Sequence, residues 1–143
     1  MKIENILDHK GEGVITVDIS LTLQSAADLM MRHRIAALVV IDGEEPVGLV
    51  SERDIVSALA QKGPRAGDTR IGEVMSSLTP AVSTNESLKR AMALMTRTRA
   101  RHLPVMEDGE LIGIVSLGDM VKHRLEEMEL ESGVLRDLAI AVR

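Results

Sequence analysis

The chain reads the same passage twice, 65 residues apart and without a gap. The segment Val47-Gly-Leu-Val-Ser-Glu-Arg-Asp54 returns as Ile112-Gly-Ile-Val-Ser-Leu-Gly-Asp119, and apolar positions before it keep the same spacing. Self-similarity at a fixed period indicates a fold made of two copies of one supersecondary unit. A polar pattern that is kept in both copies is therefore a candidate for a duplicated binding site.

The order of apolar and turn residues predicts the same elements in each copy. A short strand, around 14–17 and 81–82, precedes an apolar pattern with helical spacing. Two more strands are joined by the turn dipeptides Asp42-Gly43 and Asp108-Gly109. A second helix then starts at Ser51 or Ser116. Each copy is predicted to be β-α-β-β-α, in an α/β (α+β) fold whose two repeats pack with pseudo-twofold symmetry.

The expected boundaries follow this pattern: repeat 1 at 1–61, a linker at 62–70, repeat 2 at 71–127 and a C-terminal helix extension at 128–143. Each repeat is expected to open on a short apolar turn, containing Ile3 and Ile6 or Ile71 and Val74. Ser20 and Asn85 are the predicted caps of the first helices. The positions predicted to face the core from the second helices are Ile55, Val56, Leu59, Met120, Val121 and Leu125.

Composition narrows the classes of partner and chemistry. The chain of 143 residues holds 22 acidic and 17 basic residues, and a net charge of -5 argues against nucleic acid as a partner. It has no Phe, Tyr or Trp, so a bound base must be held by aliphatic side chains and backbone groups. It has no Cys, which removes thiol catalysis and thiolate metal sites. The longest apolar run, 35–41, is too short to span a bilayer, so we expect a cytoplasmic protein without membrane contact.

Aliphatic helical faces indicate a homodimer, because a large exposed apolar patch is unusual on a soluble monomer. The methionines expected near these outer faces are Met30, Met31, Met92 and Met95. After the second motif, apolar residues follow a heptad-like spacing at Val121, Leu125, Met128, Leu135, Leu138 and Val142. Gly133 interrupts this seam. The seam fits a helix packed on its own domain, and it also fits a dimer contact.

The repeated Gly-h-h-Ser-x-x-Asp pattern, where h is apolar, lies at a predicted strand-to-helix junction in each copy. Free N–H groups at a helix start favour an anion, so Ser51 and Ser116 are candidates for binding phosphate. One turn later, Asp54 and Asp119 can accept hydrogen bonds from two ribose hydroxyls. The alternative is a helix capping box, which needs no ligand. Glu or Gln would serve the box better, whereas Asp suits a cis-diol.

At this point the chain resembles a stand-alone tandem pair of cystathionine-β-synthase (CBS) domains. The resemblance rests on the two β-α-β-β-α copies, the two junction motifs, and the phrases Ala37-Leu-Val-Val and Arg101-His-Leu-Pro-Val. It covers roughly residues 3–127. It implies binding of adenosine-containing ligands, with ribose on the two Asp and phosphate on the two Ser. It also implies adenine regions near Ile15, Thr16 and Ala37 in one site and near Pro80, Ala81 and His102 in the other.

The copies differ in where they place positive charge. Arg53 lies inside the first motif and is a candidate phosphate contact, whereas the second motif has Gly118 there. Arg101 and His102 stand where the first copy has alanines, so the second copy takes its cations from another position. Arg53 is equally consistent with a solvated helix residue, and His102 with a strand-end histidine that has a polar neighbour.

The sequence favours a regulatory nucleotide sensor that acts on a separate, unidentified partner protein. Its regulatory ligand would be AMP, ADP or ATP, with no catalytic cofactor. The alternative is a ligand-free module for protein interaction and assembly. An enzyme is disfavoured, since the four His lack zinc-like spacing and no phosphate loop of the Gly-x-x-x-x-Gly-Lys type occurs. We therefore expect no catalytic residue and no metal site.

Overall fold

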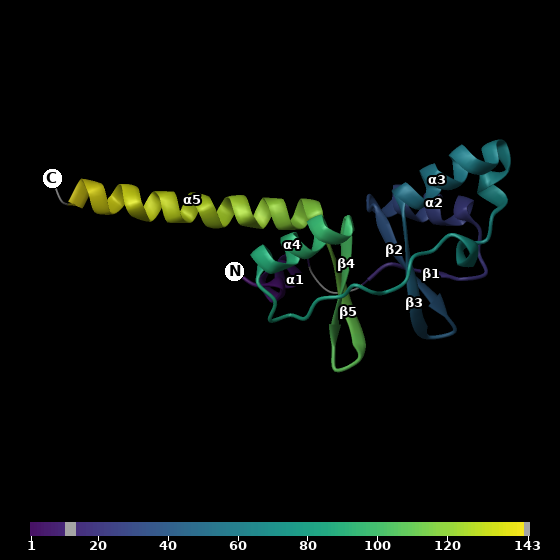
Figure 1. Ribbon diagram of the computed structural model, residues 1–143, viewed down its shortest axis with the longest axis horizontal. Helices are drawn as coiled ribbons and strands as arrows, with labels where there is room; N and C mark the ends of the chain where they lie inside the picture. Colours follow the sequence, from purple (N-terminus) through teal and green to yellow (C-terminus); the bar gives the residue numbers. More distant parts are fainter. Residues whose placement is uncertain (11–13, 142–143) are drawn as a thin grey trace. The chain divides into compact units, whose positions relative to one another are not determined.

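The computed structural model describes residues 1–10 and 14–141, with side chains up to residue 133 (Figure 1). Helices and strands alternate in the predicted order in both copies. The elements are α1 (Ile3–Lys10), β1 (Thr16–Asp18), α2 (Leu23–His33), β2 (Ala37–Asp42), β3 (Glu45–Ser51), α3 (Glu52–Lys62), the 3-10 turns Gly63–Asp68 and Ile71–Glu73, α4 (Leu88–Thr98), β4 (His102–Glu107), β5 (Glu110–Ser116) and α5 (Leu117–Ala141).

The first copy forms a three-stranded sheet in the order β1-β2-β3, with β1 parallel to β2 and β3 antiparallel to it. The second copy repeats the hairpin as β4-β5, and its first strand shortens to a single parallel bridge between Val82 and Val105. Each hairpin closes on a glycine, Gly43 or Gly109, with φ of 67° or 79°. This left-handed region costs glycine little, which explains the turn dipeptides. The α/β fold with two β-α-β-β-α repeats is confirmed.

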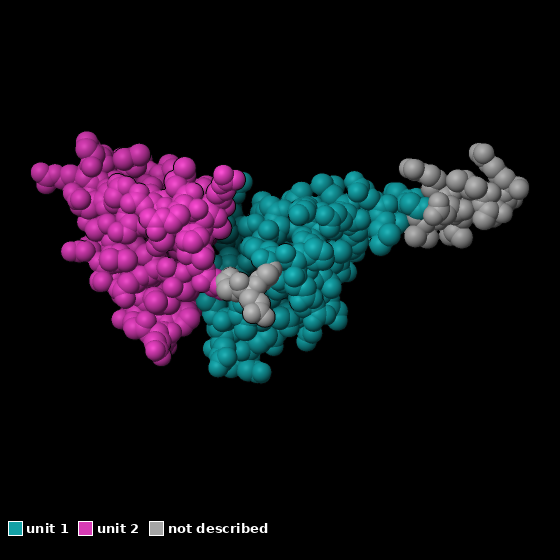
Figure 2. Space-filling model, turned by 180° about the vertical axis from the view of Figure 1, so that it is seen from behind, with its two compact units in different colours: residues 1–12, 81–143 teal, residues 13–80 magenta. Residues whose placement is uncertain are grey.

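The chain folds into two compact units, and one of them combines segments that are far apart in the sequence. Unit 2 holds residues 13–80, and unit 1 holds residues 1–12 together with 81–143 (Figure 2). Helix α1 thus packs with the second copy: Ile3 and Ile6 are fully buried in a core with Leu88 and Leu103. The segment after the first copy folds back onto that copy, where Ile71 is fully buried. The apolar turns predicted to open each repeat therefore complete the core of the other repeat.

The predicted caps of α2 and α4 are wrong by two residues. The helices are capped by Thr22 and Ser87, whose hydroxyl oxygens accept hydrogen bonds from backbone N–H groups three residues later. Ser20 is used elsewhere, since its N–H and hydroxyl both donate to the Asp18 carboxylate. Ser20 therefore belongs to the turn after β1 and does not cap α2. Asn85 likewise lies before the start of α4.

The second helices bury a narrower face than predicted. Met120 is fully buried, but Val56, Leu59, Val121 and Leu125 are exposed. The buried face instead passes through Ala58 and His123, which are both 4% exposed and lie 65 residues apart. Ile55 packs partly against the core of unit 2, so the second helices bury only part of the predicted face and the other apolar side chains remain in solvent.

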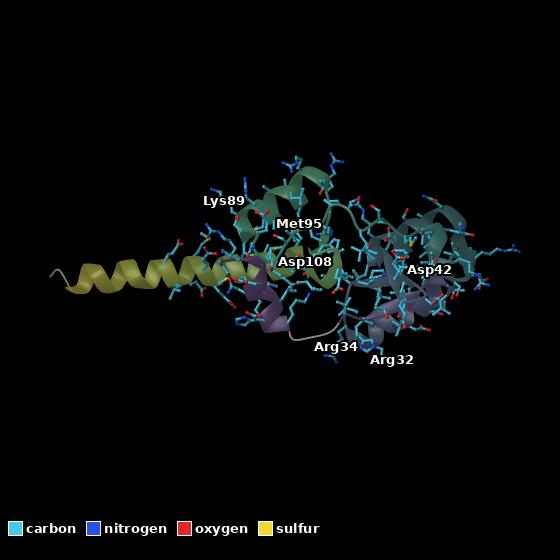
Figure 3. The ribbon with its side chains drawn as sticks, turned by 90° about the horizontal axis from the view of Figure 1, so that it is seen from below. Arg32, Arg34, Asp42, Lys89, Met95 and Asp108 are labelled. Atoms are coloured by element: carbon cyan, nitrogen blue, oxygen red, sulfur yellow. The ribbon has the colours of Figure 1, made fainter. Side chains whose placement is uncertain are left out.

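The methionines lie mostly inside the units. Met30 and Met95 belong to the cores of unit 2 and unit 1, and Met92 packs partly against the second of these. Met95 lies on the inner side of α4, whereas Lys89 projects from its outer side (Figure 3). Only Met31 of the four is exposed, at 80%. The prediction that Met30 and Met95 lie on an outer face is therefore wrong.

Candidate functional site

Two strand-to-helix junctions carry the repeated Ser and Asp, one in each unit. Ser51 ends β3 before α3, and Ser116 ends β5 before α5. Each of these strands carries a glycine, Gly48 or Gly113, where a neighbouring segment approaches closely. A Cβ at Gly48 would lie 2.5 Å from the Ser76 carbonyl oxygen, and one at Gly113 would lie 2.7 Å from Leu7 Cδ2. These glycines admit a neighbouring segment of the same unit.

In the first junction, Ser51 and Asp54 form a reciprocal capping box. The Ser51 N–H donates to Asp54 Oδ2 at 2.8 Å, and the Asp54 N–H donates to Ser51 Oγ at 3.4 Å. The Ser51 hydroxyl also donates to Asp54 Oδ2, at 3.1 Å. The capping interpretation of the motif is thus realised, and Asp takes the part that Glu usually has.

The second junction has the same box and an added cation. The Ser116 N–H donates to Asp119 Oδ2 at 2.9 Å, and the Asp119 N–H donates to Ser116 Oγ at 3.0 Å. Lys10, the last residue of α1, donates to Asp119 Oδ2 at 2.8 Å and to the Ile114 carbonyl at 3.0 Å. The carboxylate of the second junction therefore lies in an ion pair.

This environment shifts the pKa of Asp119. Burial of the carboxyl raises its pKa, but the hydrogen bonds from Lys10 and Ser116 and the charge of Lys10 outweigh burial, so the pKa lies below the ordinary value for Asp. Asp119 is therefore ionised at neutral pH and remains an acceptor for hydroxyl donors.

In both junctions, the hydrogen bonds among the described residues fall on Oδ2 of the carboxylate. No described residue donates to Oδ1 of Asp54 or of Asp119, so this oxygen can take another donor. The two carboxylates are partly buried, since each residue is of intermediate exposure. One free oxygen, held rigidly by the box, is an arrangement that accepts a ligand hydroxyl without rebuilding the cap.

The predicted adenine residues of the first copy lie on the strands next to the junction. Ala37 is directly opposite Ser51 in the hairpin. Thr16 is paired with Val39 one strand further on, and the Ile15 carbonyl accepts a hydrogen bond from the Val39 N–H at 3.1 Å. The sheet therefore brings these residues to the side of the first Ser and Asp.

In the second copy, His102 is directly opposite Ser116, as Ala37 is opposite Ser51. Ala81 precedes the single bridge of Val82. Pro80 is the last residue of unit 2, so only Ala81 and His102 share a unit with the second junction. The prediction that Pro80 contributes to this site stays a prediction.

The candidate phosphate cations of the two junctions, Arg53 and Arg101, are both exposed but come from different positions in the repeat. Arg53 is exposed on the first turn of α3, and Gly118 takes its place on α5. Arg101 is exposed, and its carbonyl accepts the Leu117 N–H at 2.8 Å, so it lies beside the start of α5. Each junction thus has an arginine at its helix start, from different positions in the repeat.

Sequence reasoning missed Lys10. The ion pair joins residues 109 positions apart, and the segment that carries Lys10 follows the 68-residue offset of the opening turns and not the 65-residue register of the motif. The available signal was the basic end of a short amphipathic segment, which is common in helices that bind nothing. No pattern in the sequence connects that end to Asp119.

Other site types find no support in the described ranges. Within residues 1–10 and 14–133, no group of three or more His, Asp or Glu is arranged to hold a metal ion. The described helices include none that is long and apolar enough to cross a membrane.

The family model for "CBS domain" matches residues 10–61 and 71–126. The CBS domain-containing protein YhcV of Bacillus subtilis (strain 168) is 34% identical over 121 residues, which cover 85% of this chain and 86% of YhcV. The crystal structure of the CBS-domain containing protein ATU1752 from Agrobacterium tumefaciens is 35% identical, with a TM-score of 0.83 over 87% of this chain and 99% of that one.

Two further solved structures carry information about ligands and assembly. The CBS domain pair of protein MJ0100, in complex with 5′-methylthioadenosine and S-adenosyl-L-methionine, matches with a TM-score of 0.74 and 24% identity over 85% of this chain and 98% of that one. The hexameric CBS-CP12 protein from bloom-forming cyanobacteria matches with a TM-score of 0.74 and 28% identity over 85% of this chain and 66% of that one.

Proposed function

Because the chain belongs to the CBS domain family, as a tandem pair of CBS domains, we propose that it is a regulatory module that binds an adenosine-containing ligand and modulates a separate protein. An adenine nucleotide such as AMP, ADP or ATP is the proposed ligand. The module is a binding protein and not an enzyme. Regulation follows when the ligand binds two conformations of the module with unequal affinity.

One observation carries this proposal: both units keep a Ser–Asp box at a strand-to-helix junction with Asp Oδ1 uncommitted among the described residues. In the proposal, Asp54 and Asp119 accept the ribose hydroxyls. The N–H groups at the starts of α3 and α5 face phosphate, together with Ser51 or Ser116. Adenosyl binding by the pair in MJ0100 supports the ligand class.

The roles of the remaining residues follow from their positions in each unit. Arg53 is the proposed phosphate cation of the first site. Adenine would lie against the strands, near Ile15, Thr16 and Ala37 in the first site, and near Ala81 and His102 in the second. Since the chain has no Phe, Tyr or Trp, backbone and aliphatic contacts must hold the base.

Thermal unfolding in the presence of adenosine compounds tests the ligand class. AMP, ADP, ATP and S-adenosylmethionine are added separately at millimolar concentration, with GMP as the control. A ligand present at 100 times its dissociation constant stabilises the folded chain by about 2.7 kcal/mol. If no adenosine compound raises the melting temperature more than GMP does, the proposal fails.

Exposed apolar side chains favour a second role in assembly. Val56 and Leu59 on α3 are 65% and 56% exposed, and Leu125 and Met128 on α5 are 55% and 48% exposed. We propose that a homodimer buries them, and oligomerisation of the related CBS-CP12 supports self-association. A ligand-free assembly module, the alternative function, would keep this association and bind no adenosine compound.

Light scattering of the variant Leu59→Glu/Leu125→Glu tests the assembly. We expect a dimer mass for the native chain and a monomer mass for the variant at micromolar concentration. The matched control is Met31→Glu, which places the same charge at an isolated exposed position on α2 and should leave the dimer intact. A monomer mass for the native chain overturns the homodimer.

A further inference from the structure

Lys10 gives the second junction a cation that the first junction obtains elsewhere, and we propose that it makes the second adenosine site selective for a ligand that carries a phosphate. This inference rests on the proposed function and deepens it. It assigns a specificity-determining residue at a position that the repeat does not duplicate.

The position of Lys10 is fixed by the packing of α1. Ile3 and Ile6 of this helix are fully buried in the core of unit 1, and Leu7 lies against Gly113 of β5. The last residue of the helix therefore reaches the junction from an anchored element. Its ammonium donates to the Ile114 carbonyl at 3.0 Å and to Asp119 Oδ2 at 2.8 Å.

Counting only contacts within the described residues, one donor of the ammonium remains available. A lysine carries three N–H donors, and two of those of Lys10 are used by Ile114 and Asp119. The Lys10 ammonium and the Ser116 N–H donate to the same carboxylate oxygen, so the ammonium lies close to the start of α5. A phosphate held at that helix start lies within reach of the third donor.

Charge explains why a cation is needed there. A carboxylate that binds ribose repels a phosphate on the same nucleoside, and the repulsion is strong where solvent is partly excluded. The first motif places Arg53 next to Asp54, whereas the second motif has Gly118 next to Asp119. Lys10 neutralises Asp119 and thereby removes a repulsion that the second motif itself does not offset.

The first junction has no counterpart of this contact in the described part of unit 2. The Leu49 carbonyl, which matches that of Ile114, accepts the Ser76 N–H at 2.8 Å. Among residues that the structure describes, Asp54 is bonded only to groups of Ser51. A backbone segment thus occupies in unit 2 the place where a lysine side chain binds in unit 1.

The experiment compares AMP with adenosine by calorimetry on the variant Asp54→Ala, in which only the second site should bind. Adding Lys10→Leu should lower the affinity for AMP about tenfold, which corresponds to the loss of one charge-assisted hydrogen bond. The affinity for adenosine should stay the same. Lys10→Arg keeps the charge and should retain most of the preference for AMP. Lys89→Leu, which removes an exposed lysine from α4 of the same unit, should change neither affinity.

Equal losses for AMP and adenosine would show that Lys10 only positions Asp119, and unchanged affinities would show that it does not act on the ligand. Either result overturns this inference and leaves the proposed function standing. If neither AMP nor adenosine binds the native chain, the inference fails, and thermal unfolding with ADP, ATP and S-adenosylmethionine decides whether the proposed function fails with it.

Discussion

The two junctions have the same Ser–Asp box, but different segments of the chain pack against them. In unit 2, the edge beside Asp54 is covered by an extended backbone segment that contacts Gly48 and pairs with Leu49. In unit 1, the matching edge is covered by the side chains of α1, with Leu7 against Gly113 and Lys10 on Asp119. The first junction is braced by the main chain of Ser76 together with the side chain of Met75, whereas side chains of α1 brace the second.

This difference shows what duplication of a motif preserves. The strands, the turn and the helix start are local, so the repeat copies them together with their hydrogen bonds. The covering segments come from the opening of the other repeat: α1 covers unit 1, and the segment around Ser76 covers unit 2. Identical motifs therefore acquire different electrostatic surroundings, because the segments that cover them carry different residues, with Lys10 at one junction and the Ser76 backbone at the other.

The largest expected effect separates the two units through α1. Ile6→Ala should destabilise unit 1 by about 3 kcal/mol, since it removes a fully buried side chain from that core. Hydrogen exchange should then speed up in α4, β4 and β5, although the mutation lies at the start of the first repeat. The matched control is Val74→Ala, which lies 68 residues later and packs in unit 2. Faster exchange in α2 and β2 upon Ile6→Ala would break the assignment of α1 to unit 1.

Substitution of Gly48 and Gly113 compares how rigidly the two neighbouring segments are held. Gly48→Ala places a Cβ on the Ser76 carbonyl oxygen, which belongs to a paired backbone, and should cost up to about 3 kcal/mol. Gly113→Ala meets only the end of Leu7, which can change rotamer, and should cost about 1 kcal/mol. Urea unfolding of both variants measures the difference. Equal losses would mean that both edges are equally rigid.

The smallest expected effect is on the stability of the fold at acid pH. Because the pKa of Asp119 is depressed in the folded chain, its ionised form stabilises the fold at neutral pH, and this contribution is lost as the pH falls below about 4. In Lys10→Leu the contribution from the ion pair is absent. Unfolding curves between pH 6 and 3 should therefore be flatter for that variant than for the native chain. Lys89→Leu should follow the native curve, and parallel curves for all three would argue against the ion pair in solution.

The sequence predicted what depends on neighbours along the chain. Both hairpins, the two helix starts at Ser51 and Ser116, and the presence of two copies of one unit followed from period, turn dipeptides and polar pattern. Exposure on α3 and α5 was predicted wrongly, because an aliphatic row next to the buried row has the same helical spacing. The exchange of opening segments and the contact of Lys10 depend on where distant segments pack, and no local pattern encodes that.

The most direct test of the account is the number of ligands bound by each Asp variant. Calorimetric titration with AMP should give two sites per native chain, and Asp54→Ala and Asp119→Ala should each retain one, with the fold preserved. Asp42→Ala, at the opposite end of the β2-β3 hairpin from Ser51, should retain both. If both junction variants bind AMP with the stoichiometry and affinity of the native chain, the two carboxylates are helix caps alone, and the proposed ribose sites do not exist.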